Sequence, residues 1–141
     1  MAAVVEDRGR FLLIEEETDE GLRINQPAGH LDPGESLLSA VRREALEETA
    51  HEFAPQALLG VYHHHVRASD ATYLRFAFCG ALGARHSDRA LDTGIVRILW
   101  MTAEEIRAAS ARHRTPLVAR CVEDFLSGRR YPLDLLQGGP D

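Results

Sequence analysis

Cysteine is scarce in this sequence, and the two that occur, Cys79 and Cys121, lack the C-x-x-C spacing of a zinc or redox motif. We therefore expect both to be small buried hydrophobic residues in a reducing compartment. No apolar run is long enough to cross a bilayer, and the start of the chain has no signal-peptide pattern. These absences predict a cytoplasmic protein without a membrane partner.

The chain also lacks an excess of basic residues, with 16 Lys and Arg against 22 Asp and Glu and a net charge of −6. Surfaces that bind nucleic acid are usually basic, so we expect no stable nucleic-acid partner. Polyphosphate substrates are not excluded, because Mg²⁺ can mediate between acidic side chains and phosphate. Repeats, low-complexity tracts and interdomain linkers are absent, which predicts a single domain over residues 1–141, as a monomer or a homodimer.

The order of apolar strands and amphipathic helices predicts an α/β layered domain. Thr102 and Glu105 have capping-box spacing at the start of one helix. The first apolar stretch is short for a core strand, so we expect the natural chain to start several residues earlier. We expect strands over residues 2–6, 11–14, 22–26, 58–66, 72–82 and 95–101, helices over 35–50, 102–111 and 115–127, and loops over 15–21 and 83–94.

One predicted helix carries a crowded set of carboxylates. Glu44, Glu47 and Glu48 are spaced i, i+3 and i+4, which places their Cβ atoms about 5–6 Å apart. At an effective dielectric near 20, two charges about 6 Å apart repel by roughly 3 kcal/mol. A divalent cation would convert this repulsion into attraction. The alternative is a solvated acidic end of a helix.

The apolar face of the same helix predicts where two of these carboxylates point. At about 100° per residue, Leu37, Val41 and Ala45 fall on one arc, and Glu44 and Glu48 project at its edge. Buried anions need partners or a metal, so we expect Glu44 and Glu48 to be direct metal ligands. Carboxylate oxygens suit Mg²⁺ or Mn²⁺ better than zinc.

These residues match a known motif. Gly29, five residues, Glu35, seven residues and then residues 43–48 (REALEE) resemble the Nudix box, which reads G, five residues, E, seven residues, R-E-U-x-E-E-x-G-U, with U aliphatic. The fixed positions from Gly29 to the last glutamate all match. Ala50 and His51 stand where the family has Gly and an aliphatic residue. This departure concerns the C-terminal end of the helix more than the metal site.

The resemblance implies a Nudix α/β/α sandwich with a mixed β-sheet, and a Mg²⁺-dependent hydrolase of nucleoside tri- and diphosphates in which activated water attacks phosphorus. Residues 25–31, 74–76 and 127–133 are similar to a phosphatase subgroup that also acts on hydroxymethylpyrimidine diphosphate. The alternatives are an ADP-ribose or other nucleotide-sugar pyrophosphatase, and a non-catalytic nucleotide-sensing module. A calcium-like structural site lacks the D-x-D-x-D-G loop that it requires.

The resemblance also implies roles for single residues. The Ala28 carbonyl joins the metal shell beside Gly29, and Glu35 and Arg43 hold the carboxylates in place. Glu47 binds a second ion or holds a metal-bound water. Either Glu47 or an acid of a later loop is the general base. We therefore expect Arg43, Glu47 and Glu48 in the catalytic machinery, Asp88 or Asp92 as the loop acid, and Arg23, Arg75 and Arg130 as candidates to grip the distal phosphate.

Three adjacent histidines, His63, His64 and His65, do not predict a zinc site. Successive strand residues point to opposite faces, so the three rings cannot converge on one ion from a regular strand. We expect structural roles, or a place at the edge of the substrate site.

Overall fold

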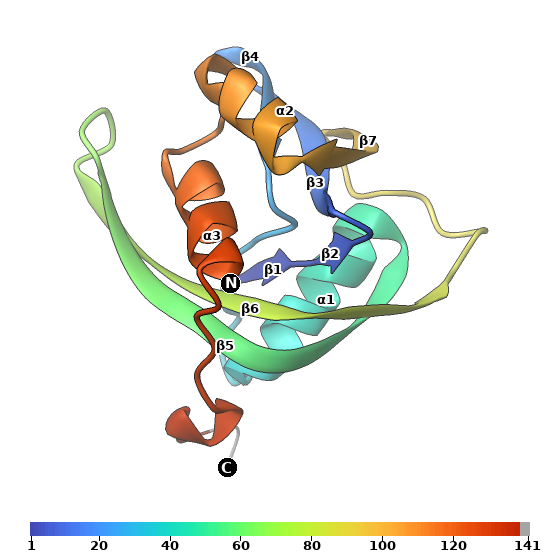
Figure 1. Cartoon of the computed structure of the whole chain (residues 1–141), viewed down its shortest axis with the longest axis vertical. Helices are drawn as coiled ribbons and strands as arrows, with labels where there is room; N and C mark the ends of the chain where they lie inside the picture. Colours follow the sequence, from blue (N-terminus) through green and yellow to red (C-terminus); the bar gives the residue numbers. More distant parts are fainter. Residues whose placement is uncertain (139–141) are drawn as a thin grey trace.

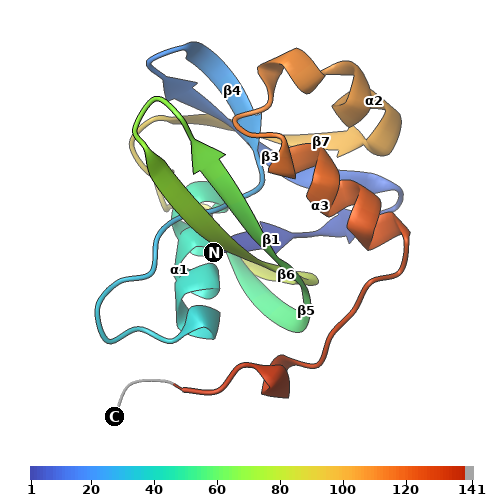
Figure 2. The same ribbon diagram turned by 90° about the vertical axis from the view of Figure 1, so that its left-hand side faces the viewer.

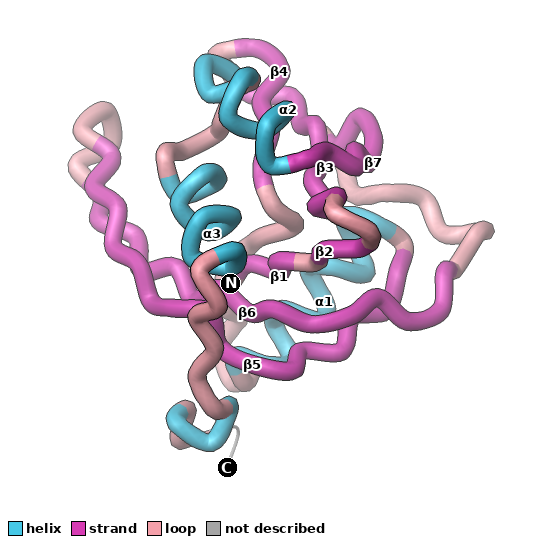
Figure 3. The backbone as a smooth tube through the Cα atoms, viewed as in Figure 1, coloured by secondary structure: helices cyan, strands magenta, loops and turns pink. Residues whose placement is uncertain are grey.

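The computed structural model describes residues 1–138. Within that part of the chain, no helix is long and apolar enough to cross a membrane. The strands are β1 (Ala2–Val4), β2 (Glu6–Asp7), β3 (Arg10–Thr18), β4 (Gly21–Asn25), β5 (His51–Val66), β6 (Ala71–Arg85) and β7 (Ile95–Thr102). The helices are α1 (Leu37–Thr49), α2 (Ala103–Ala108) and α3 (Leu117–Leu126), with short 3-10 helices η1 (Ser110–Arg112) and η2 (Leu133–Leu135) (Figure 1 and Figure 3).

The strands form two sheets. In the first sheet, with strand order β1-β6-β5, β1 runs parallel to β6 with Ala2 opposite Ala77, and β5 and β6 form a long antiparallel hairpin. In the second sheet, β3 pairs antiparallel with β2, β4 and β7. One parallel pair among antiparallel pairs makes the first sheet mixed, which confirms the predicted sheet type.

Helix α1 covers one face of the first sheet because its apolar side chains all point that way. The Ser36 hydroxyl caps the helix by accepting a hydrogen bond from the Ser39 N–H at 3.1 Å, as N-cap residues do. Val41 and Ala45 are fully buried and belong to the same apolar cluster as Phe53 of β5. The predicted helix start and the predicted buried face are both confirmed.

Helix α3 covers the opposite face of the same sheet. Val118 and Cys121 are fully buried in an apolar cluster that includes Leu59 of β5 and Ala77 of β6. Figure 2 shows α1 and α3 on the two sides of the first sheet, which confirms the predicted α/β/α arrangement. Cys79 and Cys121 are free and buried, as predicted.

The prediction of a loop over residues 15–21 is wrong. Strand β3 continues to Thr18 and turns into β4 as a hairpin, with Glu15 opposite Ile24. The acids can remain in a sheet because Glu15 is paired with Arg97 at 2.9 Å and with Arg112. These two partners come from distant parts of the chain, so local composition gave no sign of them.

The hairpin strands are longer than predicted. Strand β5 begins at His51, directly after α1, and β6 continues to Arg85. Irregular pairing around Pro55 interrupts the side-chain alternation that would have revealed the early part of β5. The capping box of Thr102 and Glu105 is present as predicted, although α2 ends three residues earlier than expected, at Ala108.

After α3 the chain returns to the first sheet. Leu58 and Tyr131 exchange two backbone hydrogen bonds, from the Leu58 N–H at 2.9 Å and from the Tyr131 N–H at 2.8 Å. Leu133 and Leu136 then pack against the apolar cluster beneath α1. The final described segment is therefore attached to the outer strand of this sheet.

Candidate active site

An open cleft of about 910 Å³ lies between β4, the segment 28–31, the β5–β6 hairpin and the start of α3. Its wall includes the backbone of Ala28 and Gly29, which also contacts the carboxylates of α1. The acidic end of the helix therefore lies directly behind one wall of the cleft.

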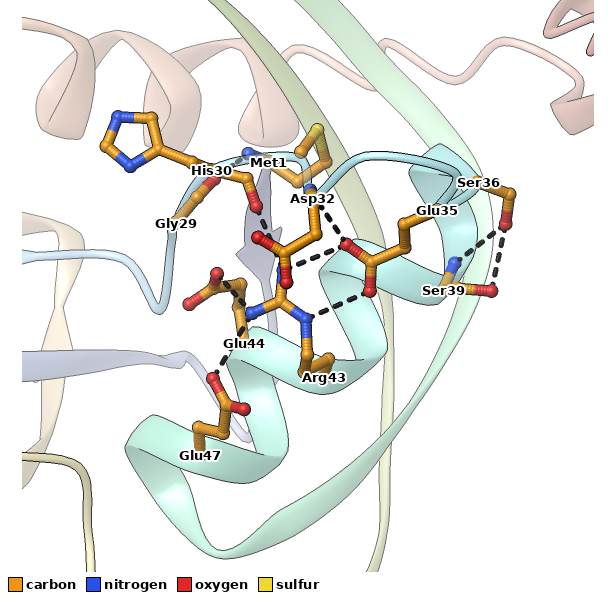
Figure 4. A network of polar contacts seen from close by, with 10 residues as sticks. All are labelled: Met1, Gly29, His30, Asp32, Glu35, Ser36, Ser39, Arg43, Glu44 and Glu47. Atoms are coloured by element: carbon orange, nitrogen blue, oxygen red, sulfur yellow. Dashed lines mark hydrogen bonds and ion pairs between the residues drawn. The ribbon is translucent and has the colours of Figure 1, made fainter. Parts of the chain in front are cut away.

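Arg43 organises the acids of α1 and of the preceding loop (Figure 4). Its Nε and Nη2 atoms donate to the two carboxylate oxygens of Glu35, both at 2.9 Å. Its Nη1 atom donates to Glu44 at 2.7 Å and to Glu47 at 3.2 Å, and Nη2 also donates to the His30 carbonyl at 2.9 Å. One guanidinium thus fixes three carboxylates and the loop that borders the cleft, as was predicted for a bidentate arginine fork.

The bonds between Arg43 and Glu35 keep both of these groups charged. Hydrogen bonding from Arg43, together with a backbone N–H from Asp32, holds the pKa of Glu35 below its usual value against the opposing effect of burial. The same bonds to Glu35 raise the pKa of Arg43. Arg43 and Glu35 therefore form a permanent ion pair at neutral pH.

Gly29 allows Glu44 to approach the loop. A Cβ atom on residue 29 would lie 2.0 Å from Glu44 Cδ and 2.1 Å from both carboxylate oxygens, so only glycine fits here. The Gly29 N–H donates to the Met1 carbonyl at 3.0 Å, and the Met1 amino group donates to the Gly29 carbonyl (Figure 4). The backbone at Gly29 is thereby held against the buried Glu44 side chain.

Glu48 is the most isolated acid of the group. It is 7% exposed, and its carboxylate accepts a hydrogen bond from the Ala28 N–H at 2.8 Å. Burial raises the pKa of Glu48 to about 8, and the negative charges of Glu16, Glu44 and Asp92 add to this effect. A nearby cation would oppose both effects, lower the pKa of Glu48 and favour its ionised carboxylate.

The acids of α1 fit a hard divalent cation by their chemistry. Within residues 1–138, no three His, Cys, Asp or Glu side chains form a ready-made metal cluster, and Glu44 and Glu47 face Arg43. The donor atoms at hand are nevertheless carboxylate and backbone oxygens, which Mg²⁺ and Mn²⁺ prefer. The space left by the missing side chain of Gly29 lets these donors meet the backbone of the cleft wall.

Sequence reasoning missed Glu16. This residue is the middle acid of the three in β3 and lines the cleft, and its Oε1 atom is buried 3.0 Å from Arg114 Nη1. Its charge acts on Glu48 of α1. Three consecutive acids directly after a buried strand could have indicated that the strand continues to the site.

Only two of the three candidate arginines, Arg75 and Arg23, line the cleft. Arg75 lines the cleft and donates to the side-chain oxygens of Gln26 at 3.0 Å and Asn25 at 3.1 Å. Arg23 lines the same cleft. Arg130 does not reach it: the Arg130 guanidinium lies 4.0 Å from the centroid of the Phe125 ring, beside a different cavity.

The two loop acids, Asp88 and Asp92, also differ in their position relative to α1. The Asp92 N–H donates to the Glu47 carbonyl at 2.9 Å, which puts Asp92 at the acidic end of α1. Asp88 is exposed, and within the described residues its side chain has no recorded bond to α1. Of the two, Asp92 is the one that the fold brings to the carboxylates.

The three adjacent histidines do not converge, as expected. His63 and His65 are exposed on one face of β5, whereas His64 points to the other face and lines the cleft. His65 lies beside Thr72 and Asp70 at the hairpin tip.

Comparisons with known proteins agree with this arrangement. Residues 1–121 match the model of the NUDIX domain. The chain is 38% identical over 136 residues to the phosphatase NudJ of Escherichia coli (strain K12), which covers 96% of this chain and 88% of that protein. The chain belongs to the NUDIX family.

Solved structures place this NUDIX chain among hydrolases. A NUDIX hydrolase from Nitrosomonas europaea shares 52% identity with a TM-score of 0.94, over 97% of this chain and 93% of that one. A MutT NUDIX hydrolase from Burkholderia pseudomallei, at 21% identity and a TM-score of 0.74, covers 87% of this chain and 93% of its own and shows the shared fold.

The protein is therefore a NUDIX hydrolase, an enzyme that acts on diphosphate bonds. NUDIX hydrolases generally depend on a divalent metal ion and act on small nucleotide substrates. The residues from Gly29 to Glu48 form its NUDIX box.

Proposed function

We propose that this NUDIX hydrolase is a Mg²⁺-dependent enzyme, with Mn²⁺ as a possible substitute, that hydrolyses nucleoside tri- and diphosphates and related small diphosphates. The observation that carries the proposal is the burial of Glu44 and Glu48 against the backbone of Ala28 and Gly29, at the wall of an open cleft. The likeness to the phosphatase NudJ supports the substrate class. In this proposal residues 1–141 act as one domain.

The metal site would use the acids of the box. Glu44, Glu48 and the Ala28 carbonyl would hold the ion, and Glu47 would hold a second ion or a water. When bound, Mg²⁺ neutralises phosphate charge and lowers the pKa of a coordinated water. Arg43 positions these carboxylates through the contacts described above.

The remaining steps fall to side chains of the chain itself. Glu47 is the less buried acid of the box and is our candidate to accept the proton of the attacking water. Arg75 presents a cation to the cleft between two neutral partners, so it can bind an anionic phosphate oxygen. Arg23, whose side chain pairs with Glu20 at 3.3 Å, is a second cation of the same cleft.

A Glu48→Gln variant tests this proposal. We expect it to keep the fold and to lower kcat with Mg²⁺ by about 10³-fold, which corresponds to about 4 kcal/mol of transition-state stabilisation. Glu104→Gln, on an exposed position of α2, is the matched control and should retain full activity. The assay follows the products of a panel of nucleoside di- and triphosphates, hydroxymethylpyrimidine diphosphate, ADP-ribose and dinucleoside polyphosphates, with Mg²⁺, Mn²⁺ or chelator. Unchanged turnover in Glu48→Gln, or full activity in chelator, would overturn the proposal.

A further inference from the structure

Two aromatic rings lie together at the cleft beside the NUDIX box. The ring centroids of His30 and Tyr73 are 6.0 Å apart, with their planes inclined at 43°. His30 follows Gly29 in the box loop, and Tyr73 belongs to β6 of the hairpin, so two separate elements bring the rings together. Both side chains line the cleft, and Tyr73 remains 44% exposed.

This pair is not part of the apolar core. Neither His30 nor Tyr73 belongs to the two buried clusters that hold the sheets and helices together. The exposed side chain of Leu31 lines the same cleft. An accessible ring surface with apolar neighbours in a concave site is typical of a place where a flat ligand stacks.

The ring pair is fixed at a short distance from the acids of the box. The His30 carbonyl accepts a hydrogen bond from Arg43, and the preceding residue, Gly29, touches Glu44. Consecutive Cα atoms are about 3.8 Å apart, so the His30 backbone is about one residue from the carboxylates. The loop that carries the His30 ring is therefore the same loop that contacts the acids.

A cation lies on the same strand as Tyr73. Arg75 is two residues from Tyr73 on β6, so both side chains point to the same face of the strand. Within residues 1–138, Arg75 has no recorded ion pair with a carboxylate, and its side-chain partners are the neutral Asn25 and Gln26. An aromatic surface beside an arginine without an acidic partner matches a ligand that combines a ring with an anionic chain.

We propose that His30 and Tyr73 form a subsite for the planar aromatic ring of the substrate, with Arg75 holding the attached phosphate chain. This inference rests on the proposed function and narrows its substrate class. The enzyme then prefers a single aromatic ring on a di- or triphosphate over an alkyl diphosphate of the same length. The enzyme also prefers such a ligand over dinucleoside polyphosphates, whose phosphate chains are longer.

The test compares binding of two non-hydrolysable ligands to the full chain with Mg²⁺: a nucleoside methylenediphosphonate and a butyl methylenediphosphonate. We expect calorimetry to show a preference for the nucleoside ligand. Tyr73→Leu, which removes the ring, should reduce this preference about tenfold, because stacking one base on an aromatic side chain commonly contributes this much or more. Tyr73→Phe keeps the ring and should keep the preference. Thr72→Val, on the opposite face of the hairpin, is the control for folding.

The outcomes separate this inference from the proposed function. Equal affinities for the two ligands, or a preference that survives Tyr73→Leu, would overturn the ring subsite even if the wild type hydrolyses diphosphates. Failure to bind either ligand would also overturn it. A Tyr73-dependent preference in a wild type that releases no product would support the subsite and refute the proposed function.

Discussion

The Cα atom of Gly29 faces the Glu44 carboxylate so closely that a side chain on residue 29 would occupy the position of that carboxylate. A Gly29→Ala variant must therefore displace either the loop or Glu44. Displacement of a catalytic group by about 1 Å can cost about 10²-fold in rate. We expect kcat with Mg²⁺ to fall by this factor in a steady-state assay.

Gly34 provides the matched control. Its φ of +77° makes alanine unfavourable there, but a Cβ would meet nothing within 4 Å. Gly34→Ala should lower the melting temperature slightly and keep kcat. Equal activity losses in the two variants would contradict a specific role for the Gly29 contact.

Ala50 occupies a position that suits glycine. It ends α1 with a φ of 57° and its N–H donates to the Leu46 carbonyl at 2.9 Å. A left-handed conformation costs a residue with a Cβ atom roughly 1–2 kcal/mol. We expect Ala50→Gly to raise the free energy of unfolding by about 1 kcal/mol, measured by chemical denaturation. Ala45→Gly, inside the helix, should lower it by about 1 kcal/mol or more.

The proposed general base should be needed for turnover. We expect Glu47→Gln to lower kcat by about 10²-fold or more in a steady-state assay. Asp88→Asn should be within twofold of wild type, since Asp88 has no recorded bond to α1 within the described residues. If Asp92→Asn causes this loss of kcat and Glu47→Gln does not, Asp92 is the base and Glu47 is not.

Two of the three candidate phosphate-binding arginines, Arg75 and Arg130, should respond differently to substitution. Arg75→Gln removes a cation from the cleft, so KM for a nucleoside diphosphate should rise by about tenfold or more, as for the loss of a charged hydrogen bond. Arg130→Gln loses its contact with the Phe125 ring and its hydrogen bonds to the Phe125 and Arg129 carbonyls, which lie outside the cleft, and should keep KM. Steady-state kinetics with circular dichroism as a folding check decides this, and an equal rise in both variants would refute the assignment.

Glu15 should make the stability depend on pH. Hydrogen bonding from Arg97 holds its pKa below 4.5, and its side chain is only 4% exposed. Because the folded pKa is lowered, the stabilisation is present above pH 4.5 and is lost as the pH falls through the folded value. Because both arginine partners are about half exposed, we expect Glu15→Gln to lower the free energy of unfolding by about 1.5 kcal/mol at pH 7 and by much less at pH 3.

Glu17 is an exposed acid on the same strand and serves as the control for this measurement. Glu17→Gln should change the free energy of unfolding by less than about 0.5 kcal/mol at both pH values. A pH-independent loss in Glu15→Gln would show that packing, and not the ion pairs, makes this residue important.

The sequence predicted the part of the site that one helix builds. The apolar arc of α1 correctly indicated that Glu44 and Glu48 point inward, because helical periodicity relates neighbours that are close in sequence. The fork of Arg43 on Glu35 lies within the same motif and was also predicted. These features depend on local geometry alone.

What the sequence did not predict depends on contacts between distant residues. Glu15 was assigned to a loop because its arginine partners lie 82 and 97 residues further along the chain. The meeting of His30 and Tyr73 likewise depends on how the hairpin folds over the box loop. Composition cannot show such neighbours, since each of these residues is ordinary in its own segment.

The backbone hydrogen bonds between Leu58 and Tyr131 also affect the tendency of the protein to aggregate. An outer strand with free N–H and C=O groups can recruit strands from other molecules and start aggregation. The segment after α3 occupies these groups at Leu58 and covers the neighbouring apolar surface with Leu133 and Leu136. A chain shortened before Tyr131 would leave this edge open, and we infer that the segment serves colloidal stability as well as folding.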